Sequence, residues 1–211
     1  YIREMKSLTP AVNVATLIGH NTIRNYTLKG NRERSANAKE IKSMANIVGN
    51  ALDEGAIGFS TGLMYSPGYF AGKEEIETLL KEVSKRNKTY ATHMRDEGNH
   101  LEESVKETIK HAQNTGVRLQ ISHHKAVGKD NYGKVKKTIP MIEEAREQIK
   151  VHTDMYVYNS ASTVLKALLP KEIIQSVEGN INAIQNNKEY NNMQNVKGLQ
   201  NMFRNNWEDV I

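Results

Sequence analysis

Five short segments of the chain are apolar enough to form buried strands. Several combine apolar and β-branched residues without strict alternation, which is typical of strands covered on both faces. The segments span residues 12–19, 56–62, 89–93, 117–123 and 149–158. The pattern therefore predicts five short strands.

The segments between these strands repeat apolar residues at steps of three and four, the spacing of one helix face. Asn37 followed by Glu40 predicts a capping box at the start of the first helix. Gly55 and Gly116 predict two helix ends, and Pro140 predicts a kink or a delayed start in the last helix. The apolar stripes are Ile41, Met44, Ala45, Val48 and Leu52; Ile76, Leu79, Leu80 and Val83; Leu101, Val105, Ile109 and Ala112; and Val135, Ile139, Ile142 and Ala145.

Strands and helices alternate along the chain. Alternation of this kind implies parallel strands joined by right-handed crossovers. Two α/β architectures satisfy it: a doubly wound open sheet and a (β/α)8 barrel. Both place their chemistry at the carboxyl ends of the strands, so the polar residues at those ends are the candidate functional residues.

The C-terminal part of the chain differs in composition. Ten asparagines lie between positions 180 and 206, together with lysine and glutamine. Apolar residues nevertheless keep a helical rhythm through residues 173–184. We therefore expect a polar, mostly helical segment there.

Composition and charge narrow the class of protein. The 211 residues suffice for one domain with a sizeable core. No run approaches the roughly 18 consecutive apolar residues of a membrane span. The net charge of +5 is scattered along the chain, so we expect a solvated surface rather than a nucleic-acid interface.

The N-terminus and the cysteine content bear on processing and compartment. The chain has no initiator methionine, and no apolar region follows its first charges as in a signal peptide. We therefore expect a processed product or a piece of a longer protein. The absence of cysteine excludes a disulfide framework and a cysteine-ligated metal within this chain. This composition fits a reducing compartment, and we expect a cytoplasmic protein.

Two consecutive predicted strands end in histidines. His93 ends the strand over 89–93, and His123 ends the next strand, over 117–123. Neighbouring parallel strands lie ~4.8 Å apart, so imidazoles at matched strand ends can converge on one ion, each at about 2.0–2.1 Å from zinc. The alternative is a structural role for each histidine. The pair predicts a metal site, in which each histidine needs an acceptor that fixes its tautomer.

Other polar residues follow the same strand ends. Lys125 lies just after His123, where an ammonium group can pair with a substrate carboxylate. Tyr156 and Ser162 offer hydroxyl groups at the end of the fifth strand. The alternatives are a solvated loop lysine, a packing tyrosine and a serine that starts a helix.

The remaining histidines give weaker signals. In an extended strand the side chain of His124 points away from that of His123, which favours packing against a helix or support of a ligand. His20 follows the first predicted strand and stays ambiguous. His20 and Asp154 are the candidates for a further metal ligand.

The glycine-rich segment 55–63 matches neither the phosphate loop nor the dinucleotide-binding fingerprint. This mismatch disfavours a doubly wound nucleotide-binding protein.

Three segments together resemble the D-aminoacylases, the N-acyl-D-amino-acid deacylases of the amidohydrolase superfamily. They read AIGFSTGLMYSPG at 56–68, ATHMRDE at 91–97 and QISHHK at 120–125. The motifs occur in the order of the family. The resemblance runs from about residue 11 to residue 170 and continues more weakly to residue 211.

This resemblance implies a distorted, TIM-like (β/α)8 barrel that holds Zn2+ at the carboxyl ends of its strands. His93 and His123 match the metal-ligating histidines of the fifth and sixth barrel strands. Lys125, Tyr156 and Ser162 match positions that hold the substrate carboxylate.

Several family features have no counterpart in this sequence. They are a His-x-His pair on the first strand, a metal-ligating cysteine, a catalytic aspartate on the eighth strand and a small β-sandwich domain. Val157 also stands where the family usually has proline. The resemblance therefore implies that residues 1–158 are the central part of the barrel, about strands 3 to 7, and that residues 159–211 belong to a helical lid insertion. No catalytic residue is expected in this chain, because the family aspartate would lie beyond residue 211.

The implied activity of the complete protein is zinc-dependent hydrolysis of N-acyl-D-amino acids, with this small molecule rather than a nucleic acid or a membrane as its partner. In the family, the aspartate passes a proton from the attacking water to the leaving amine. A dihydroorotase- or hydantoinase-like amidohydrolase is one alternative, but it usually carries a bridging lysine on the fourth strand, and residues 59–62 include none. The other alternative is a truncated, non-catalytic fragment, and we expect the 211-residue chain by itself to be inactive.

Overall fold

The structure, a computed structural model, describes residues 2–158, 160, 162 and 163. The chain divides into two compact units, residues 1–156 and 157–211, and all the helices and strands given below belong to the first unit. The predicted helical lid over 159–211 lies outside the described residues, apart from positions 160, 162 and 163. None of the described helices has the length and apolar character needed to cross a bilayer.

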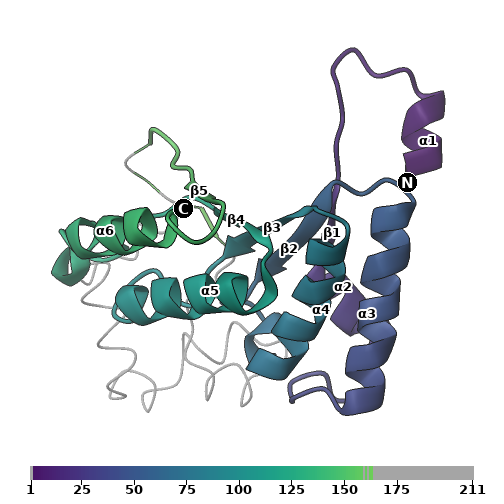
Figure 1. The fold of residues 1–211 in the computed structure, drawn as a ribbon, viewed down its shortest axis with the longest axis horizontal. Helices are drawn as coiled ribbons and strands as arrows, with labels where there is room; N and C mark the ends of the chain where they lie inside the picture. The colour runs from purple at the N-terminus through teal and green to yellow at the C-terminus, as the bar shows by residue number, and fades with distance from the viewer. Residues whose placement is uncertain (1, 159, 161, 164–211) are drawn as a thin grey trace, which may run out of the picture. The chain divides into compact units, whose positions relative to one another are not determined.

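Five parallel strands form one sheet in the described part of the chain, in the order β1-β2-β3-β4-β5 (Figure 1). A doubly wound sheet reverses its strand order at a switch point, whereas a barrel adds each strand beside the previous one. The uninterrupted order therefore identifies part of a TIM-like (β/α)8 barrel. The strands are β1 (Leu17–Gly19), β2 (Gly58–Gly62), β3 (Thr89–His93), β4 (Arg118–Ile121) and β5 (Val151–Thr153).

The helices follow one another along the sheet. Helices α3 to α6 each contact the next one in the chain, as expected when every crossover has the same hand (Figure 1). The helices are α1 (Ile2–Ser7), α2 (His20–Thr27), α3 (Ala38–Asp53), α4 (Lys73–Lys85), α5 (Leu101–Thr115) and α6 (Val135–Ala145), with short 3-10 turns at η1 (Gly68–Phe70) and η2 (Lys129–Asn131).

Local sequence signals explain several helix ends. The predicted capping box is present at the start of α3: the Asn37 side chain accepts from the backbone N–H of Glu40, and the Glu40 carboxylate accepts from the backbone N–H of Asn37. Gly116 ends α5 in a left-handed conformation with φ of 69°, which a residue with a Cβ rarely adopts. Pro140 lies inside α6, which begins at Val135, so the alternative of a delayed start is wrong.

The observed strands are shorter than the predicted ones, except for β3. Val12 and Val14 are exposed and lie outside any strand, because apolar character alone does not decide where a backbone hydrogen-bond ladder ends. Helix α2 was not predicted, because its buried side chains include His20 and Arg24 beside a single buried aliphatic residue, Ile23. When buried positions of a helix carry charged or polar side chains, the apolar residues no longer repeat at helical spacing, so the sequence pattern does not indicate a helix.

Alternate strand residues form the core. Phe59 and Tyr90 stack at 6.1 Å between ring centroids and belong to the same buried cluster as the apolar faces of α3, α4 and α5. The Thr61 hydroxyl lies 2.9 Å from the Tyr90 hydroxyl and 2.8 Å from that of Thr92, which satisfies these buried polar groups. The other face of β3 is only half-buried in the described part of the chain, so the prediction of strands covered on both faces is wrong there. His93 lies on this more accessible face.

The glycine-rich segment serves strand packing. A Cβ on Gly58 would lie 2.2 Å from the backbone oxygen of Thr89, far closer than van der Waals contact allows. Gly58 therefore lets β2 approach β3 at the start of their parallel ladder, where Gly58 pairs with Thr89.

Candidate metal centre

The ends of β3 and β4 bring the two predicted metal-ligating histidines together. His93 is the last residue of β3, and His123 follows β4 by two residues. Nδ1 of His93 lies 3.0 Å from Nε2 of His123, and the ring centroids are 4.6 Å apart. Both residues are partly buried. The two imidazoles therefore face each other at the carboxyl edge of the sheet.

A carboxylate from a third strand end aims the His123 side chain. His123 has a left-handed backbone conformation with φ of 42°, so the predicted strand over 117–123 ends early, at Ile121. The carboxylate of Asp154 accepts hydrogen bonds from the backbone N–H of His123 at 2.7 Å and from the Gln120 side chain at 2.5 Å. A strained backbone conformation of order 1–3 kcal/mol persists only where the surroundings enforce it. Asp154 supplies such a constraint from the end of β5.

Glu97 lies behind His123. Its Oε1 is 2.9 Å from Nδ1 of His123, and its Oε2 accepts a hydrogen bond of 2.5 Å from Nζ of Lys125. Potential ligand atoms of His93, Glu97 and His123 all lie within 4.8 Å of one another. No role for Glu97 follows from the sequence pattern. The available signal is its position four residues after His93, in the same loop at the exit of β3.

The protonation states at this site suit a cation. Burial raises the pKa of Glu97, but hydrogen bonds from His123 and Lys125 outweigh burial, so the net shift of this pKa is downward. Burial lowers the pKa of His93 and favours the neutral imidazole, the form that ligates metals. An ionised carboxylate therefore stands behind a pair that includes a neutral histidine.

The hydrogen bonds of the histidines leave lone pairs where a metal needs them. An ionised Glu97 can only accept, so Nδ1 of His123 carries a proton and Nε2 keeps its lone pair. Sδ of Met64 lies 3.3 Å from Nε2 of His93 and can accept a hydrogen bond from a protonated Nε2, which leaves the lone pair of Nδ1 of His93 for a metal. Two nitrogen ligands of a tetrahedral zinc lie ~3.3 Å apart, close to the observed 3.0 Å. The donor set fits zinc, with Glu97 as the acceptor behind a ligand rather than a ligand itself.

The predicted substrate-binding residues fall in two units. Nζ of Lys125 also donates to the backbone oxygen of His123 at 3.1 Å and lies 5.5 Å from the centre of the Tyr156 ring. Burial and the nearby Glu97 raise the pKa of Tyr156. Lys125 and Tyr156 are therefore neighbours beside the histidine pair. Ser162 is an exposed residue of the second unit, and its role stays a prediction.

The candidates for a further metal ligand have other partners. His20 is buried, and its Nε2 lies 2.7 Å from Oε1 of Glu75. Its ring packs edge-on against Phe59. Both carboxylate oxygens of Asp154 accept the hydrogen bonds described above. Within the described residues, neither His20 nor Asp154 belongs to the cluster of potential ligands.

Two other polar residues near the strand ends have structural roles. His124 is buried, and its Nε2 lies 2.9 Å from the Thr138 hydroxyl of α6, so it packs against a helix as predicted. Ser60 stands in the sequence Gly-Phe-Ser-Thr-Gly, the letter pattern of a hydrolase nucleophile elbow. Ser60 lies inside β2 rather than at a sharp turn between strand and helix, so the structure does not support a nucleophile there.

The fold and the site define a class of protein. Consecutive parallel strands of a (β/α)8 barrel present convergent histidines at their carboxyl ends, as the resemblance to the amidohydrolases predicts. Comparison with models of protein families gives no match. Similarity to individual proteins is nevertheless clear.

The chain is 38% identical over 166 residues to a D-aminoacylase of Alcaligenes xylosoxydans xylosoxydans, and the match covers 79% of this chain and 34% of that protein. Among solved structures, the N-acyl-D-glutamate deacylase of Bordetella bronchiseptica superposes with a TM-score of 0.72 at 34% identity, over 74% of this chain and 33% of that one. That structure holds zinc and a phosphonate inhibitor that mimics the tetrahedral intermediate. A D-aminoacylase with a binuclear metal centre superposes with a TM-score of 0.68 at 40% identity, over 71% of this chain and 31% of that one.

These matches confirm the relationship to the D-aminoacylases and the partial amidohydrolase barrel. The chain spans about one third of the length of the relatives it matches. The family relationship therefore covers the part of the barrel that carries His93 and His123.

Replacing Glu97 by glutamine should weaken metal binding about 10–100-fold, the usual effect of losing the acceptor behind a ligating histidine. The amide removes the negative charge that fixes the tautomer of His123 and pairs with Lys125. Competition with a chromogenic chelator measures the affinity. Glu102→Gln, which disrupts an exposed ion pair with Lys137, is the matched control. Equal affinities of the two variants would contradict the role assigned to Glu97.

Proposed function

We propose that the whole protein represented by this chain is a zinc-dependent deacylase that hydrolyses N-acyl-D-amino acids to a D-amino acid and a carboxylate. The observation that carries the proposal is the 3.0 Å approach of His93 Nδ1 to His123 Nε2 at the carboxyl ends of two barrel strands. The relationship to a D-aminoacylase and to an N-acyl-D-glutamate deacylase supports both the metal and the substrate class.

His93 and His123 would hold the metal. A bound zinc would polarise the scissile carbonyl and lower the pKa of a water molecule toward ~7. Glu97 accepts a hydrogen bond from Nδ1–H of His123, so the Nε2 lone pair of His123 stays directed at His93. Met64 can accept a hydrogen bond from Nε2–H of His93, which keeps the Nδ1 lone pair of His93 directed at the metal position. The chain thus preorganises two ligands without requiring either ring to turn.

Lys125 and Tyr156 are proposed to bind the substrate carboxylate, together with Ser162. An ammonium group has three N–H donors. The Glu97 carboxylate and the His123 backbone oxygen accept from two of them. Nδ1 of His123 lies 3.2 Å from Nζ of Lys125, but its proton points to Glu97, so it does not accept and the third donor is left for a ligand. The Lys125 side chain is 13% exposed, so a charge-assisted hydrogen bond there is partly shielded from water. Specificity for an acid over its amide would follow.

The test uses N-acetyl-D-methionine, its L-enantiomer and its carboxamide as substrates of the zinc-loaded whole protein. Release of the D-amino acid without release from the L-enantiomer is expected. Turnover of neither enantiomer, or of both equally, would count against the proposed activity.

Lys125→Met should raise KM for N-acetyl-D-methionine about tenfold to a hundredfold, because a hydrogen bond to a charged group contributes about 1.5–3 kcal/mol. Zinc content should stay unchanged. Lys129→Met replaces an exposed lysine of the same loop and serves as control. An equal loss on the carboxamide, or an unchanged KM for the acid, would show that Lys125 does not bind the carboxylate.

A further inference from the structure

The segment between β2 and α4 forms a wall around the ring of His93. At its start, the backbone N–H of Leu63 donates to the backbone oxygen of His93 at 3.1 Å. Sδ of Met64 lies 3.3 Å from Nε2 of His93. The Tyr65 ring centroid lies 5.0 Å from that of His93. The orientation of His93 therefore depends on where residues 63–72, here called the β2–α4 loop, are held.

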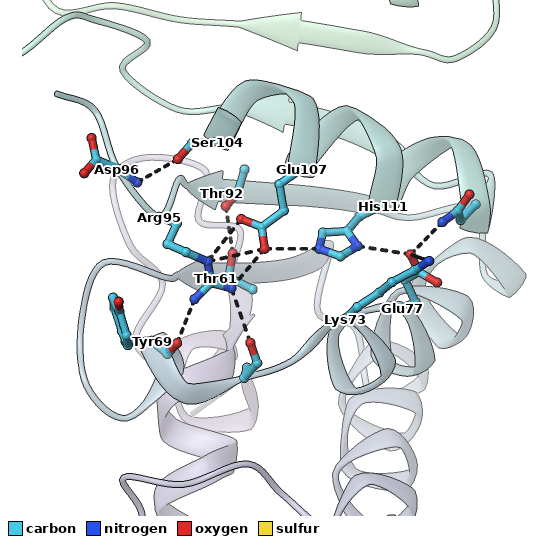
Figure 2. A network of polar contacts seen from close by, with 12 residues as sticks. Thr61, Tyr69, Lys73, Glu77, Thr92, Arg95, Asp96, Ser104, Glu107 and His111 are labelled. Carbon is cyan, nitrogen blue, oxygen red and sulfur yellow. Dashed lines mark hydrogen bonds and ion pairs between the residues drawn. The ribbon is translucent and has the colours of Figure 1, made fainter. Parts of the chain in front are cut away.

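Arg95 ties the far end of this loop to the exit of β3. It lies two residues after His93, and its Nη1 donates to the backbone oxygen of Tyr69 at 2.7 Å (Figure 2). Nη2 donates to the backbone oxygen of Ala71 at 3.3 Å. The guanidinium also lies 5.7 Å from the centre of the Tyr69 ring. The Arg95 side chain thus contacts the backbone oxygen of Tyr69, the ring of Tyr69 and the backbone oxygen of Ala71, which lie in η1 or directly after it.

A carboxylate of α5 anchors this guanidinium. Glu107 accepts from Nε of Arg95 at 3.1 Å and from Nη2 at 3.1 Å (Figure 2). Burial raises the pKa of Glu107, but the nearby His111 ring, whose Nε2 lies 3.7 Å from Oε1, and the hydrogen bonds from Arg95 lower it to about 2. His111 is buried, and its Nδ1 lies 3.2 Å from Oε1 of Glu77 on α4. The network therefore joins the β3 exit to the packed helices α4 and α5.

We propose that Arg95 is a positioning residue for the candidate metal centre: it holds the β2–α4 loop against His93 through the backbone oxygens of Tyr69 and Ala71, with Glu107 as its anchor. The metal part of this inference rests on the proposed function. The planar fork of arginine is required, because a lysine ammonium cannot span a carboxylate and two separate carbonyl groups in one geometry.

A second arginine of the chain, Arg86, forms ion pairs away from the β2–α4 loop. Arg86 pairs with Asp53 at 2.6 Å and with Glu82 at 2.9 Å. Within the described residues, the Arg86 side chain donates to the backbone oxygen of Glu82 in its own helical turn, and not to a loop near the histidines. Arg86→Gln therefore matches Arg95→Gln in chemistry and differs from it in the loop contacts.

The experiment compares these two glutamine variants of the whole protein in the metal-free state and with cobalt(II). Hydrogen exchange of the peptide that covers residues 63–72 is measured without metal. Its amides include those of Tyr69 and Ala71, which donate within the loop at 2.8 and 3.0 Å. Arg95→Gln should speed this exchange at least tenfold, while Arg86→Gln should leave it unchanged.

The cobalt(II) arm reads the histidine site itself. Arg95→Gln should weaken cobalt(II) binding about tenfold and alter its visible absorption, as loss of a support behind a metal ligand does. Arg95→Lys should restore neither the exchange rate nor the spectrum. In an active preparation, Arg95→Gln should lower kcat by up to about 10²-fold, the effect of displacing a catalytic group by about 1 Å, and should change KM less.

The outcomes separate this inference from the proposed function. If the wild-type protein binds no cobalt(II), the metal centre of the proposed function is wrong, and the exchange comparison still supports or overturns the loop-holding role of Arg95. If the wild-type protein binds cobalt(II) and the two glutamine variants agree in exchange and affinity, the inference about Arg95 is wrong while the proposed function stands.

Discussion

Replacing either His93 or His123 by alanine in the whole protein should remove most of the bound zinc and abolish deacylase activity. A catalytic zinc normally has three protein ligands and one open position, so each histidine would supply one of only three protein ligands. The loss in affinity should exceed the roughly 10–100-fold expected for a change behind a ligand. Metal analysis after gel filtration, together with a chelator titration, measures the stoichiometry and the affinity.

The structure provides a control for each part of this result. His100 is an exposed histidine in the loop that follows His93, and its side chain makes no capping hydrogen bond at the start of α5. His100→Ala should keep wild-type zinc and activity. His124→Ala should lower the free energy of unfolding through loss of the buried contact with Thr138, without matching the loss of zinc. Full zinc stoichiometry in both the His93 and His123 variants would refute the candidate metal centre.

The chain from Tyr1 to Ile211, expressed by itself and saturated with zinc, should turn over N-acetyl-D-methionine at least ~10⁴-fold more slowly than a complete D-aminoacylase. Two matched histidines are one ligand fewer than a catalytic zinc normally has. A positioned acid–base group, for which this chain offers no matched candidate, contributes about 10²–10⁴-fold by itself. A displacement of the remaining groups by about 1 Å costs a further factor near 10².

The sheet gives this prediction a second, independent readout. In the described part of the chain, β1 pairs only with β2 and β5 pairs only with β4, so each leaves one edge unpaired. Unpaired edges of this kind template association between chains. Light scattering should therefore show concentration-dependent aggregation, while circular dichroism retains the signal of the helices. Turnover within tenfold of a complete D-aminoacylase would show that these 211 residues suffice for catalysis.

Much of the architecture is local information and could be predicted from the sequence. Apolar periodicity separates strands from helices because each element must bury one face, and the order of the elements follows the chain. The capping box of Asn37 and Glu40 and the left-handed Gly116 depend on neighbouring backbone groups alone, so both were predictable. His93 could be placed at a strand end for the same reason.

The choice between a doubly wound sheet and a barrel was not local. Both alternate strands with helices, and only the pairing of β1 with β2 through to β4 with β5 distinguishes them. Helix α2 escaped prediction for a related reason. Its buried Arg24 and His20 are tolerated because Glu75, far away in the sequence, pairs with both.

The candidate site divides in the same way. His93, His123 and Lys125 lie at or just after strand ends. They could be identified from the sequence, because a strand end is a local feature. Their chemistry depends on groups that only the tertiary structure brings near: Asp154 holds the left-handed turn of His123 across β4 and β5, and Glu97 fixes its tautomer from the β3 exit. Hydrogen bonds are directional and act over about 3 Å, so sequence spacing alone does not reveal them.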